Sequence, residues 1–487
     1  MLFSSIPFLY YFLPCVLILY AIAPKKLKNF VLMLTSLVFY GWGEPKYVLL
    51  MVATIGIGYV SGLMIEKCID TKPKLAKAVL IITVLIDLGF LGYFKYANFF
   101  VENFVLLTGL DVKLLNIALP IGISFYTFQL LSYVVDVYRN EVKAQKNFFW
   151  LLLYSSLFYQ CIAGPIVRYS DVQREITERK SSFNDVSEGI TRFTVGLGKK
   201  ALLANTCGSL SDNLLVADSL IASSPDVALA ELSSRSVAGI FFGVLFYMLQ
   251  IYLDFSAYSD MAIGMGRMVG FHFKENFLYP YTAKSVTDFW RRWHISLSTF
   301  FRDYVYIPLG GNRKGKFNTY RNLLIVWFLT GLWHGASWNF ILWGLFFFIF
   351  LVIEKLGFSK LLDKIPAFFS HAYLLVVVYF GWILFRFSDF RFIPVVIKGL
   401  FGLNGNPIID FETRTLLISN VIFIIVALFS VTPLVKRIAA KAKDSESMSF
   451  GRFVYAVTNI LAPIVLLLLS TLALIGDSYN PFLYFQF

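Results

Sequence analysis

Charged residues are scarce in this chain. Asp, Glu, Lys and Arg make up 15% of its 487 residues, whereas a soluble protein carries about 25%. Hydrophobic residues make up 58% and aromatic residues 18%, and the mean hydropathy is +0.69. A chain with so little charge and no polar region of ordinary domain size belongs in a lipid bilayer. The composition therefore argues against a soluble globular protein and predicts a membrane protein.

Cysteine is also rare. The four cysteines (Cys15, Cys68, Cys161 and Cys207) form no CxxC pair and no zinc-ligand spacing, so we interpret them as structural or incidental and expect no metal. The sequence contains no Walker loop, no GxSxG elbow and no HExxH motif, and the glycines between 264 and 270 do not fit the GxGxxG spacing. We therefore expect no bound cofactor.

Acidic residues are fewer than basic ones, 30 against 43, which gives a net charge of +13. In a soluble chain this excess would suggest nucleic acid as a partner. In a membrane chain it indicates lysine and arginine on cytoplasmic loops, so we expect lipid contact and no nucleic acid. The first residues lack a basic region and a cleavage site, which predicts a retained first helix.

Long apolar runs predict an all-α polytopic membrane protein with about eleven or twelve transmembrane helices. A closed β-barrel would show short alternating segments instead. No internal repeat stands out, and we expect one membrane domain over residues 1–487. The expected spans lie near 6–23, 29–43, 47–66, 78–97, 116–137, 148–166, 190–208, 237–254, 322–333 with 336–354, 372–387, 415–435 and 456–476.

The basic loops predict the orientation. Residues 24–28 contain three lysines after the first span, which places this loop inside and the N-terminus outside. The lysines of residues 67–77 fall inside after two more crossings, in agreement. Residues 139–146 and 167–192 are both basic, so segment 148–166 has both ends inside. We interpret it as a re-entrant hairpin that turns at Gly164 and Pro165.

Residues 279–316 combine aromatic side chains with many cations and are too charged to span. On a helix, Trp293 and Leu297 share one face while His294 and Ser298 lie toward another. This pattern predicts a helix in the cytoplasmic interface. The segment is either an anchor or a rim that meets a phosphate-bearing group. Its candidate site residues are His294, Ser298, Arg302 and Asp303.

His334 interrupts an apolar run from Leu323 to Phe350. A polar group in lipid is costly unless it faces a partner or a cavity. His334 is either a packed histidine or a general base, since a buried imidazole favours its neutral form. Gly331 and Gly335 would admit a neighbouring helix, and Trp333, Trp338 and Asn339 would line the site. His272 and His371 are expected at the interface.

Residues 251–267 place two aspartates, two tyrosines and two serines within apolar sequence. Asp254 and Asp260 could hold the arginines of the rim segment, which would make Asp260 part of the site. The alternative is a structural polar network inside the bundle.

Several of these stretches resemble the membrane-bound O-acyltransferase (MBOAT) superfamily. They are RRWHISLSTFFRDYVYIPLGGNR (291–313), LTGLWHGASWNFILWG (329–344), DFSAYSDMAIGMGRMVGF (254–271), ISFYTFQLLSYVVDVYR (123–139), IAGPIVRY (162–169) and NPFLYFQF (480–487). The core motifs fall within residues 251–355, and the resemblance covers nearly the whole chain. It is greatest to the bacterial branch that contains alginate O-acetylase.

The resemblance implies a many-helix fold around a central tunnel, with His334 as the catalytic membrane histidine and His294 as the second polar position. It implies a multi-pass protein of the bacterial cytoplasmic membrane that moves an acyl group from a cytoplasmic thioester, acetyl-CoA, toward a polysaccharide hydroxyl outside. An extracytoplasmic esterase-like acyltransferase is the expected partner. Two alternatives stay open at this point: D-alanyl transfer to teichoic acid from a carrier-protein thioester, and a polysaccharide or lipid transporter without enzymatic activity.

Overall fold

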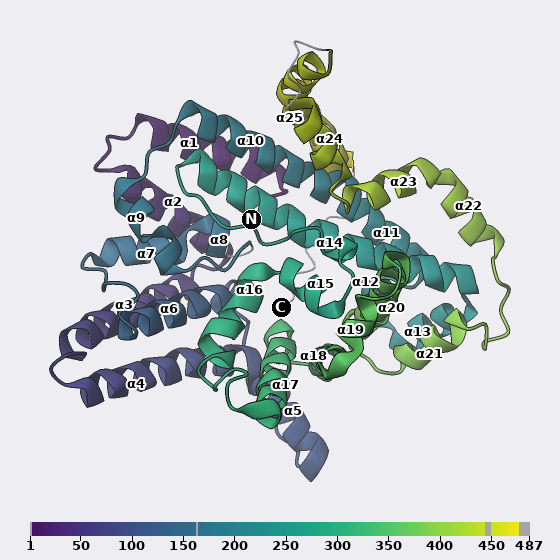
Figure 1. Cartoon of the computed structure of the whole chain (residues 1–487), viewed down its shortest axis with the longest axis horizontal. Coiled ribbons are helices and arrows are strands. Elements are labelled where there is room, and N and C mark those ends of the chain that lie inside the picture. The colour runs from purple at the N-terminus through teal and green to yellow at the C-terminus, as the bar shows by residue number, and fades with distance from the viewer. Residues whose placement is uncertain (1, 162–163, 444–449, 477–487) are drawn as a thin grey trace.

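The computed structural model describes residues 2–161, 164–443 and 450–476. Within these ranges every regular element is a helix, which confirms the all-α prediction (Figure 1). Gly164 and Pro165 are described but residues 162 and 163 are not, and the C-terminal motif at 480–487 also lies outside the described residues.

Most of the N-terminal helices lie at the left of Figure 1, in purple and blue, and α5 (Ala97–Thr108) lies at the lower centre. The N-terminal helices are α1 (Leu13–Ile22), α2 (Lys28–Gly43), α3 (Tyr47–Cys68), α4 (Pro73–Leu91), α5 (Ala97–Thr108), α6 (Ile123–Tyr138), α7 (Phe148–Ser156), α8 (Phe158–Cys161) and α9 (Tyr169–Glu178). Two π-helical turns interrupt this part, η1 (Phe8–Phe12) and η2 (Gly92–Tyr96).

The remaining helices form the centre and the other side. They are α10 (Phe183–Gly198), α11 (Asn205–Leu214), α12 (Asp218–Ser223), α13 (Pro225–Ser234), α14 (Val237–Met268), α15 (Val286–Arg292), α16 (Ile295–Phe301), α17 (Gly315–His334), α18 (Trp338–Ile353), α19 (Ser359–Leu362), α20 (Ala367–Arg386), α21 (Phe392–Leu400), α22 (Phe411–Ser419), α23 (Val421–Ser430), α24 (Leu434–Lys443) and α25 (Phe450–Gly476). Short turns add η3 (Lys199–Ala204), η4 (Pro280–Thr282), η5 (Arg302–Tyr306) and η6 (Glu354–Phe358).

Fewer helices than expected are long and apolar enough to cross a bilayer alone. Among the described residues there are five, and α22 with α23 forms a sixth if that bent pair is one span. The five are Tyr47–Cys68, Pro73–Thr108, Val237–Met268, Trp338–Leu362 and Ala367–Arg386. Several other expected spans are present as shorter or broken helices, because glycine, proline and polar residues end the regular hydrogen bonding within them.

Residues on the two flanks of the segment expected as a re-entrant hairpin contact one another. α7 ends at Ser156, and α8 ends at Cys161. The amide of Gln145 donates to the hydroxyl of Tyr169 at 2.9 Å, and Tyr154 donates to the carbonyl of Val167 at 2.9 Å. The expected turn at Gly164 and Pro165 stays a prediction, because residues 162 and 163 are not among the described residues.

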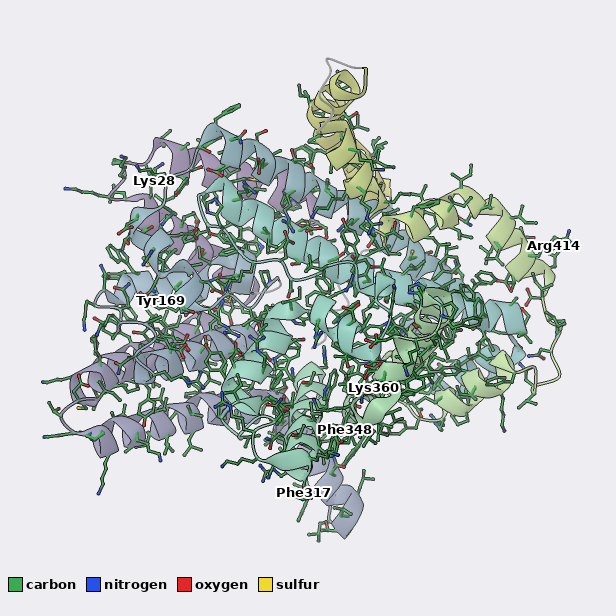
Figure 2. All side chains as sticks on the ribbon, in the orientation of Figure 1. Lys28, Tyr169, Phe317, Phe348, Lys360 and Arg414 are labelled. Atoms are coloured by element: carbon green, nitrogen blue, oxygen red, sulfur yellow. The ribbon has the colours of Figure 1, made fainter. Side chains whose placement is uncertain are left out.

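α14 is the buried centre of the fold, and α10 packs closely along it (Figure 1). A Cβ on Gly264 would lie 2.7 Å from the carbonyl oxygen of Gly189, so glycine is required where the two backbones approach. α15 and α16 lie between α14 and the pair α17–α18. Side chains fill the spaces between these ribbons (Figure 2). This arrangement brings the rim segment against the helix that carries His334.

Candidate active site

The helix that carries His334 ends at this residue. α17 stops at His334, Gly335 is extended, and α18 begins at Trp338 after a three-residue break. α17 and α18 pack tightly on both sides of the break, because a Cβ on Gly331 would overlap the carbonyl oxygen of Phe340 and one on Gly344 would overlap that of Trp327. The expectation that small residues here admit a neighbouring helix is confirmed.

His334 is buried among aromatic rings, with an exposed fraction of 2%. Its ring centroid lies 4.9 Å from those of Trp333 and Trp343 and 5.3 Å from that of Phe385. Phe385 belongs to α20, so three helices enclose the imidazole. Such an apolar enclosure disfavours the charged imidazolium and favours the neutral, proton-accepting form of the ring.

His294 lies between the short helices α15 and α16, outside the membrane-spanning helices. It is 1% exposed, and burial lowers its pKa to about 3, so its imidazole is neutral near pH 7. Its backbone is left-handed, with φ 44° and ψ 54°. A non-glycine residue pays roughly 1–2 kcal/mol for this conformation, and such strain occurs where surrounding structure fixes a functional side chain.

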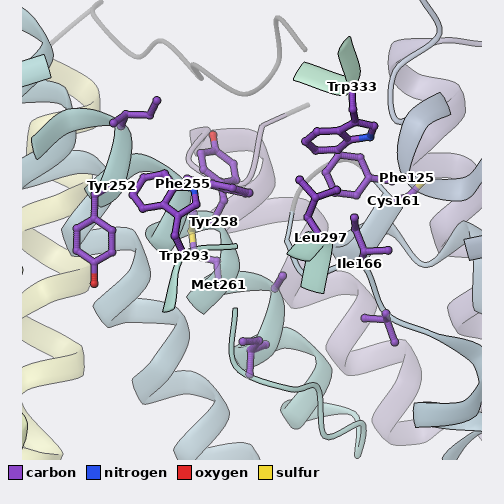
Figure 3. Close-up of a cluster of buried hydrophobic side chains, with 14 of the residues drawn as sticks. Phe125, Cys161, Ile166, Tyr252, Phe255, Tyr258, Met261, Trp293, Leu297 and Trp333 are labelled. Carbon is purple, nitrogen blue, oxygen red and sulfur yellow. The ribbon is translucent and has the colours of Figure 1, made fainter. Parts of the chain in front are cut away.

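Trp333 connects the two histidines. Its ring centroid lies 5.6 Å from that of His294 and 4.9 Å from that of His334. Figure 3 shows Trp333 beside Phe125 and Leu297, with Trp293 on the opposite side of the same buried cluster. The rim segment and the end of α17, distant in sequence, therefore share one packed core.

A cavity of about 570 Å³ joins the two histidines to the surface, a volume that suits a small-molecule ligand. Its lining includes both imidazoles together with Ser298 and Arg302. Arg291, Arg302 and Lys355 line it and are exposed, whereas both histidines are buried. The cavity therefore runs from an exposed cationic mouth to a buried pair of imidazoles.

Three indole groups near this cavity are buried without an acceptor. Nε1 of Trp290, Trp333 and Trp343 has no hydrogen-bond partner among the residues that the structure describes. A buried N–H group left without a partner costs roughly 1–3 kcal/mol. Trp290 lines the cavity, so its N–H group is available to an oxygen atom of a bound ligand. Trp333 and Trp343 flank His334 and are not among the described residues that line the cavity.

Glu354 holds the rim segment against α18. It is 1% exposed, and its oxygens accept the backbone N–H groups of Val286 at 2.6 Å and Thr287 at 2.9 Å. It also accepts the hydroxyl of Thr287 at 2.6 Å. These bonds satisfy N–H groups at the start of α15 that have no partner within the helix, and they fix the helix that precedes His294.

Other predicted site residues act beside the cavity. Asp303 forms ion pairs with Arg168 at 2.8 Å and with Arg302 at 2.7 Å, so it orients a cation at the cavity mouth.

Two predicted site residues lie at the start of α18. Asn339 donates to the carbonyl of Phe385 at 3.3 Å, which ties α18 to α20 beside His334. Trp338 is 50% exposed and donates to Asn103 at 2.8 Å; it is not among the described residues that line this cavity.

The expectation that Asp260 holds the rim arginines is wrong. Asp260 pairs with Arg192 at 2.8 Å and with Lys199 at 2.6 Å, both on the α10–η3 side of α14. Asp254 pairs with Lys200 at 2.8 Å, and both side chains are buried. The physical reason is the close α10–α14 packing, which brings these cations nearer than the rim. The alternative of a structural network inside the bundle describes Asp260.

Sequence reasoning missed several residues around the site. Glu354 and Asn276 carry no local pattern that marks them, since their partners come from distant segments. Lys95 did carry a signal, because a lone lysine in an apolar run is a functional candidate by default. Arg291 was expected in the cationic rim, on the helix face that carries His294 and Ser298, whereas Lys355 was visible only as a cation after a span.

Comparison with known proteins agrees with this geometry. The model of the "MBOAT, membrane-bound O-acyltransferase family" matches residues 138–394. The chain is 38% identical to "Probable alginate O-acetylase AlgI" of Pseudomonas putida, with 100% of both chains covered. It is 33% identical to "Peptidoglycan O-acetyltransferase" of Helicobacter pylori over 83% of this chain and 80% of that one. It is 29% identical to "Teichoic acid D-alanyltransferase" of Streptococcus thermophilus over 49% of this chain and 58% of that one.

The chain therefore belongs to the membrane-bound O-acyltransferase family. It is a multi-pass membrane protein and an O-acyltransferase, as the sequence predicted.

Proposed function

We propose that this protein transfers an acetyl group from acetyl-CoA on the cytoplasmic side to a polysaccharide hydroxyl on the outer side of the bacterial cytoplasmic membrane. The observation that carries the proposal is the cavity that leads from Arg291, Arg302 and Lys355 to His294 and His334. Exposed cations suit the phosphates of coenzyme A, and a water-poor interior limits hydrolysis of the thioester.

In this reaction His334 acts as the general base. It takes the proton from the attacking hydroxyl, the new C–O bond forms as the C–S bond breaks, and the proton passes to the leaving thiolate. Such assistance contributes about 10²–10⁴-fold to the rate. The buried indole N–H of Trp290, which lines the cavity, supports the developing negative charge on the acyl oxygen. His294, which also lines the cavity, orients the donor.

The basic loops support a cytoplasmic donor side and an N-terminus outside. The acceptor follows from the relatives, whose names specify O-acetylation of alginate and of peptidoglycan. An extracytoplasmic esterase-like acyltransferase would carry the group from this protein to the polymer. D-alanyl transfer from a carrier protein is the second candidate, because a D-alanyltransferase matches about half of this chain.

The test uses the purified protein in lipid vesicles with radiolabelled acetyl-CoA and a soluble sugar acceptor. Wild type is compared with His334→Ala and with His272→Ala, which changes an exposed histidine outside the cavity. We expect His334→Ala to lose at least about a hundredfold in kcat and His272→Ala to keep wild-type activity. Full activity of His334→Ala would refute the role of this histidine. Activity only with a D-alanyl carrier protein would favour the second candidate.

A further inference from the structure

The end of α17 leaves backbone carbonyl groups that need hydrogen-bond donors from outside this helix. A helix leaves its last carbonyl groups without partners inside the helix, and lipid cannot supply them. α17 ends at His334 within the protein, and the following residues do not continue the helix. The carbonyls of Leu332 and Trp333 therefore need donors from another part of the chain.

Two consecutive residues of η2 supply these donors. Lys95 donates through Nζ to the carbonyl oxygen of Trp333, and Tyr96 donates through its hydroxyl to that of Leu332 at 2.9 Å. Nζ of Lys95 also lies 3.5 Å from the hydroxyl of Ser124 and 5.6 Å from the ring centroid of Trp333. The residue next to His334 is therefore held through both its carbonyl and its indole.

The π-helical turn allows this double contact. Hydrogen bonds from i to i+5 place more residues in a turn than an α-helix does, so successive side chains diverge less in direction. The partial negative charge at the C-terminal end of α17 also favours a hydrogen-bond donor there.

The same helical span also holds the other side of the break. Trp338, the first residue of α18, donates to Asn103 at 2.8 Å, and its ring lies 5.8 Å from that of Phe99. Asn103 and Phe99 belong to α5, which continues from η2. Contacts from Pro73–Thr108 therefore reach both flanks of the three-residue break.

We propose that Lys95 and Tyr96 are positioning residues that fix the end of α17 and thereby aim the imidazole of His334 at the reacting hydroxyl. This inference rests on the proposed role of His334 as the base. A catalytic group displaced by about 1 Å can cost about a hundredfold in rate. Loss of the donors should therefore lower kcat and leave binding of the donor at the cationic mouth unchanged.

The experiment measures kcat and the donor KM for Lys95→Met, Lys95→Arg and Tyr96→Phe in lipid vesicles with acetyl-CoA. Matched controls are Lys113→Met, an exposed lysine, and Tyr93→Phe, an exposed tyrosine of the same π-helical turn. We expect Lys95→Met to lose at least about tenfold in kcat with an unchanged KM. Lys95→Arg should recover most of the loss, Tyr96→Phe should show a smaller loss, and both controls should match wild type.

Hydrogen–deuterium exchange at residues 332–337 gives a readout that does not depend on activity. We expect faster exchange there in Lys95→Met and in Tyr96→Phe, and wild-type exchange in the controls. Tyr96→Phe removes one oxygen atom only, so it tests the inference if Lys95→Met does not fold. Wild-type kcat and exchange in both variants, with His334→Ala inactive, would overturn the positioning role alone. An active His334→Ala would instead overturn the proposed base.

Discussion

Oδ1 of Asn276 lies 3.2 Å from Nδ1 of His294, and the same oxygen accepts the backbone N–H of Ser296 at 3.2 Å. A backbone N–H can only donate, so Ser296 identifies this side-chain atom of Asn276 as the oxygen. An oxygen of this kind accepts a hydrogen bond, and Nδ1 of His294 must therefore carry the proton. Nε2 is then the basic nitrogen of this imidazole.

This relationship predicts the effect of Asn276→Asp on the pH profile. In wild type the pKa of His294 is about 3, so the ring is neutral between about pH 5 and pH 9. An aspartate would accept the same bonds and would raise this pKa by adding a negative charge. The protonated ring would then accumulate as the pH falls, and the acid limb of kcat/KM should move to higher pH.

Asn276→Ala is the matched control for that profile. It removes the acceptor without adding charge, so we expect lower kcat at every pH and no shift of the acid limb. Superimposable profiles for wild type and Asn276→Asp would show that His294 does not influence the reaction.

His294→Asn tests separately the backbone strain at His294 and the chemical role of its imidazole. Asparagine adopts the left-handed conformation more readily than most residues but leaves a cavity where the buried imidazole packed, so we expect a thermal midpoint below that of wild type and above that of His294→Ala. The variant lacks the imidazole, and we expect kcat to fall by about tenfold or more. Thermal melting and acyl transfer measured on the same sample check both statements. A thermal midpoint no higher than that of His294→Ala would contradict our account of this backbone.

Charge removal at the cavity mouth should weaken donor binding. Arg291→Gln and Lys355→Gln are each expected to raise the KM for acetyl-CoA by up to about fivefold, because a charged contact contributes roughly 0.2–1 kcal/mol at an exposed site. The kcat should change little, since both cations are exposed and both histidines are buried. Raised salt should shrink the difference from wild type. Lys360→Gln is the control: Lys360 is exposed nearby on α19 and is outside the cavity lining (Figure 2). An equal effect at Lys360 would contradict a specific mouth.

Glu354→Gln tests the attachment of the rim segment. The amide keeps one accepting oxygen, but it loses the second acceptor for the start of α15. A buried hydrogen bond to a charged group contributes roughly 1.5–3 kcal/mol, so we expect a lower thermal midpoint and faster hydrogen exchange in residues 285–294. Glu178→Gln, at an exposed position on α9, should match wild type. Unchanged exchange in Glu354→Gln would show that α15 is held by other contacts.

Much of the site could be predicted from local sequence. His294 and His334 stand out because a polar group among apolar or aromatic residues is costly unless it has a partner. Ser298 and Arg302 follow His294 at intervals of four residues, the spacing of one helix face. Trp333 was expected to line the site; its ring contacts both histidines, but it is not among the described residues that line the cavity. Trp338 was expected there too, but helix α18 turns its ring outward toward Asn103. Local spacing determines the face of a helix and cannot determine which neighbour covers that face.

The partners of the ion pairs could not be predicted from local sequence either. From the sequence, Asp260 could have paired with the rim arginines, and only the approach of α10 to α14 at Gly189 and Gly264 brings Arg192 and Lys199 to it. The number of membrane spans also depends on tertiary contacts. Neighbouring helices supply hydrogen-bond partners to backbone groups at breaks within apolar runs, so some expected spans are short helices instead.

The sequence by itself determined that this protein is helical and membrane-embedded, that it has a basic rim, and that His334 is set within apolar surroundings. These properties follow from composition and periodicity, which act over one or two turns of helix. Only the tertiary structure decided that the rim cavity ends at His334, that Glu354 holds α15, and that Lys95 and Tyr96 hold the end of α17. Buried hydrogen bonds between distant segments depend on how whole helices pack, and no local pattern records that packing.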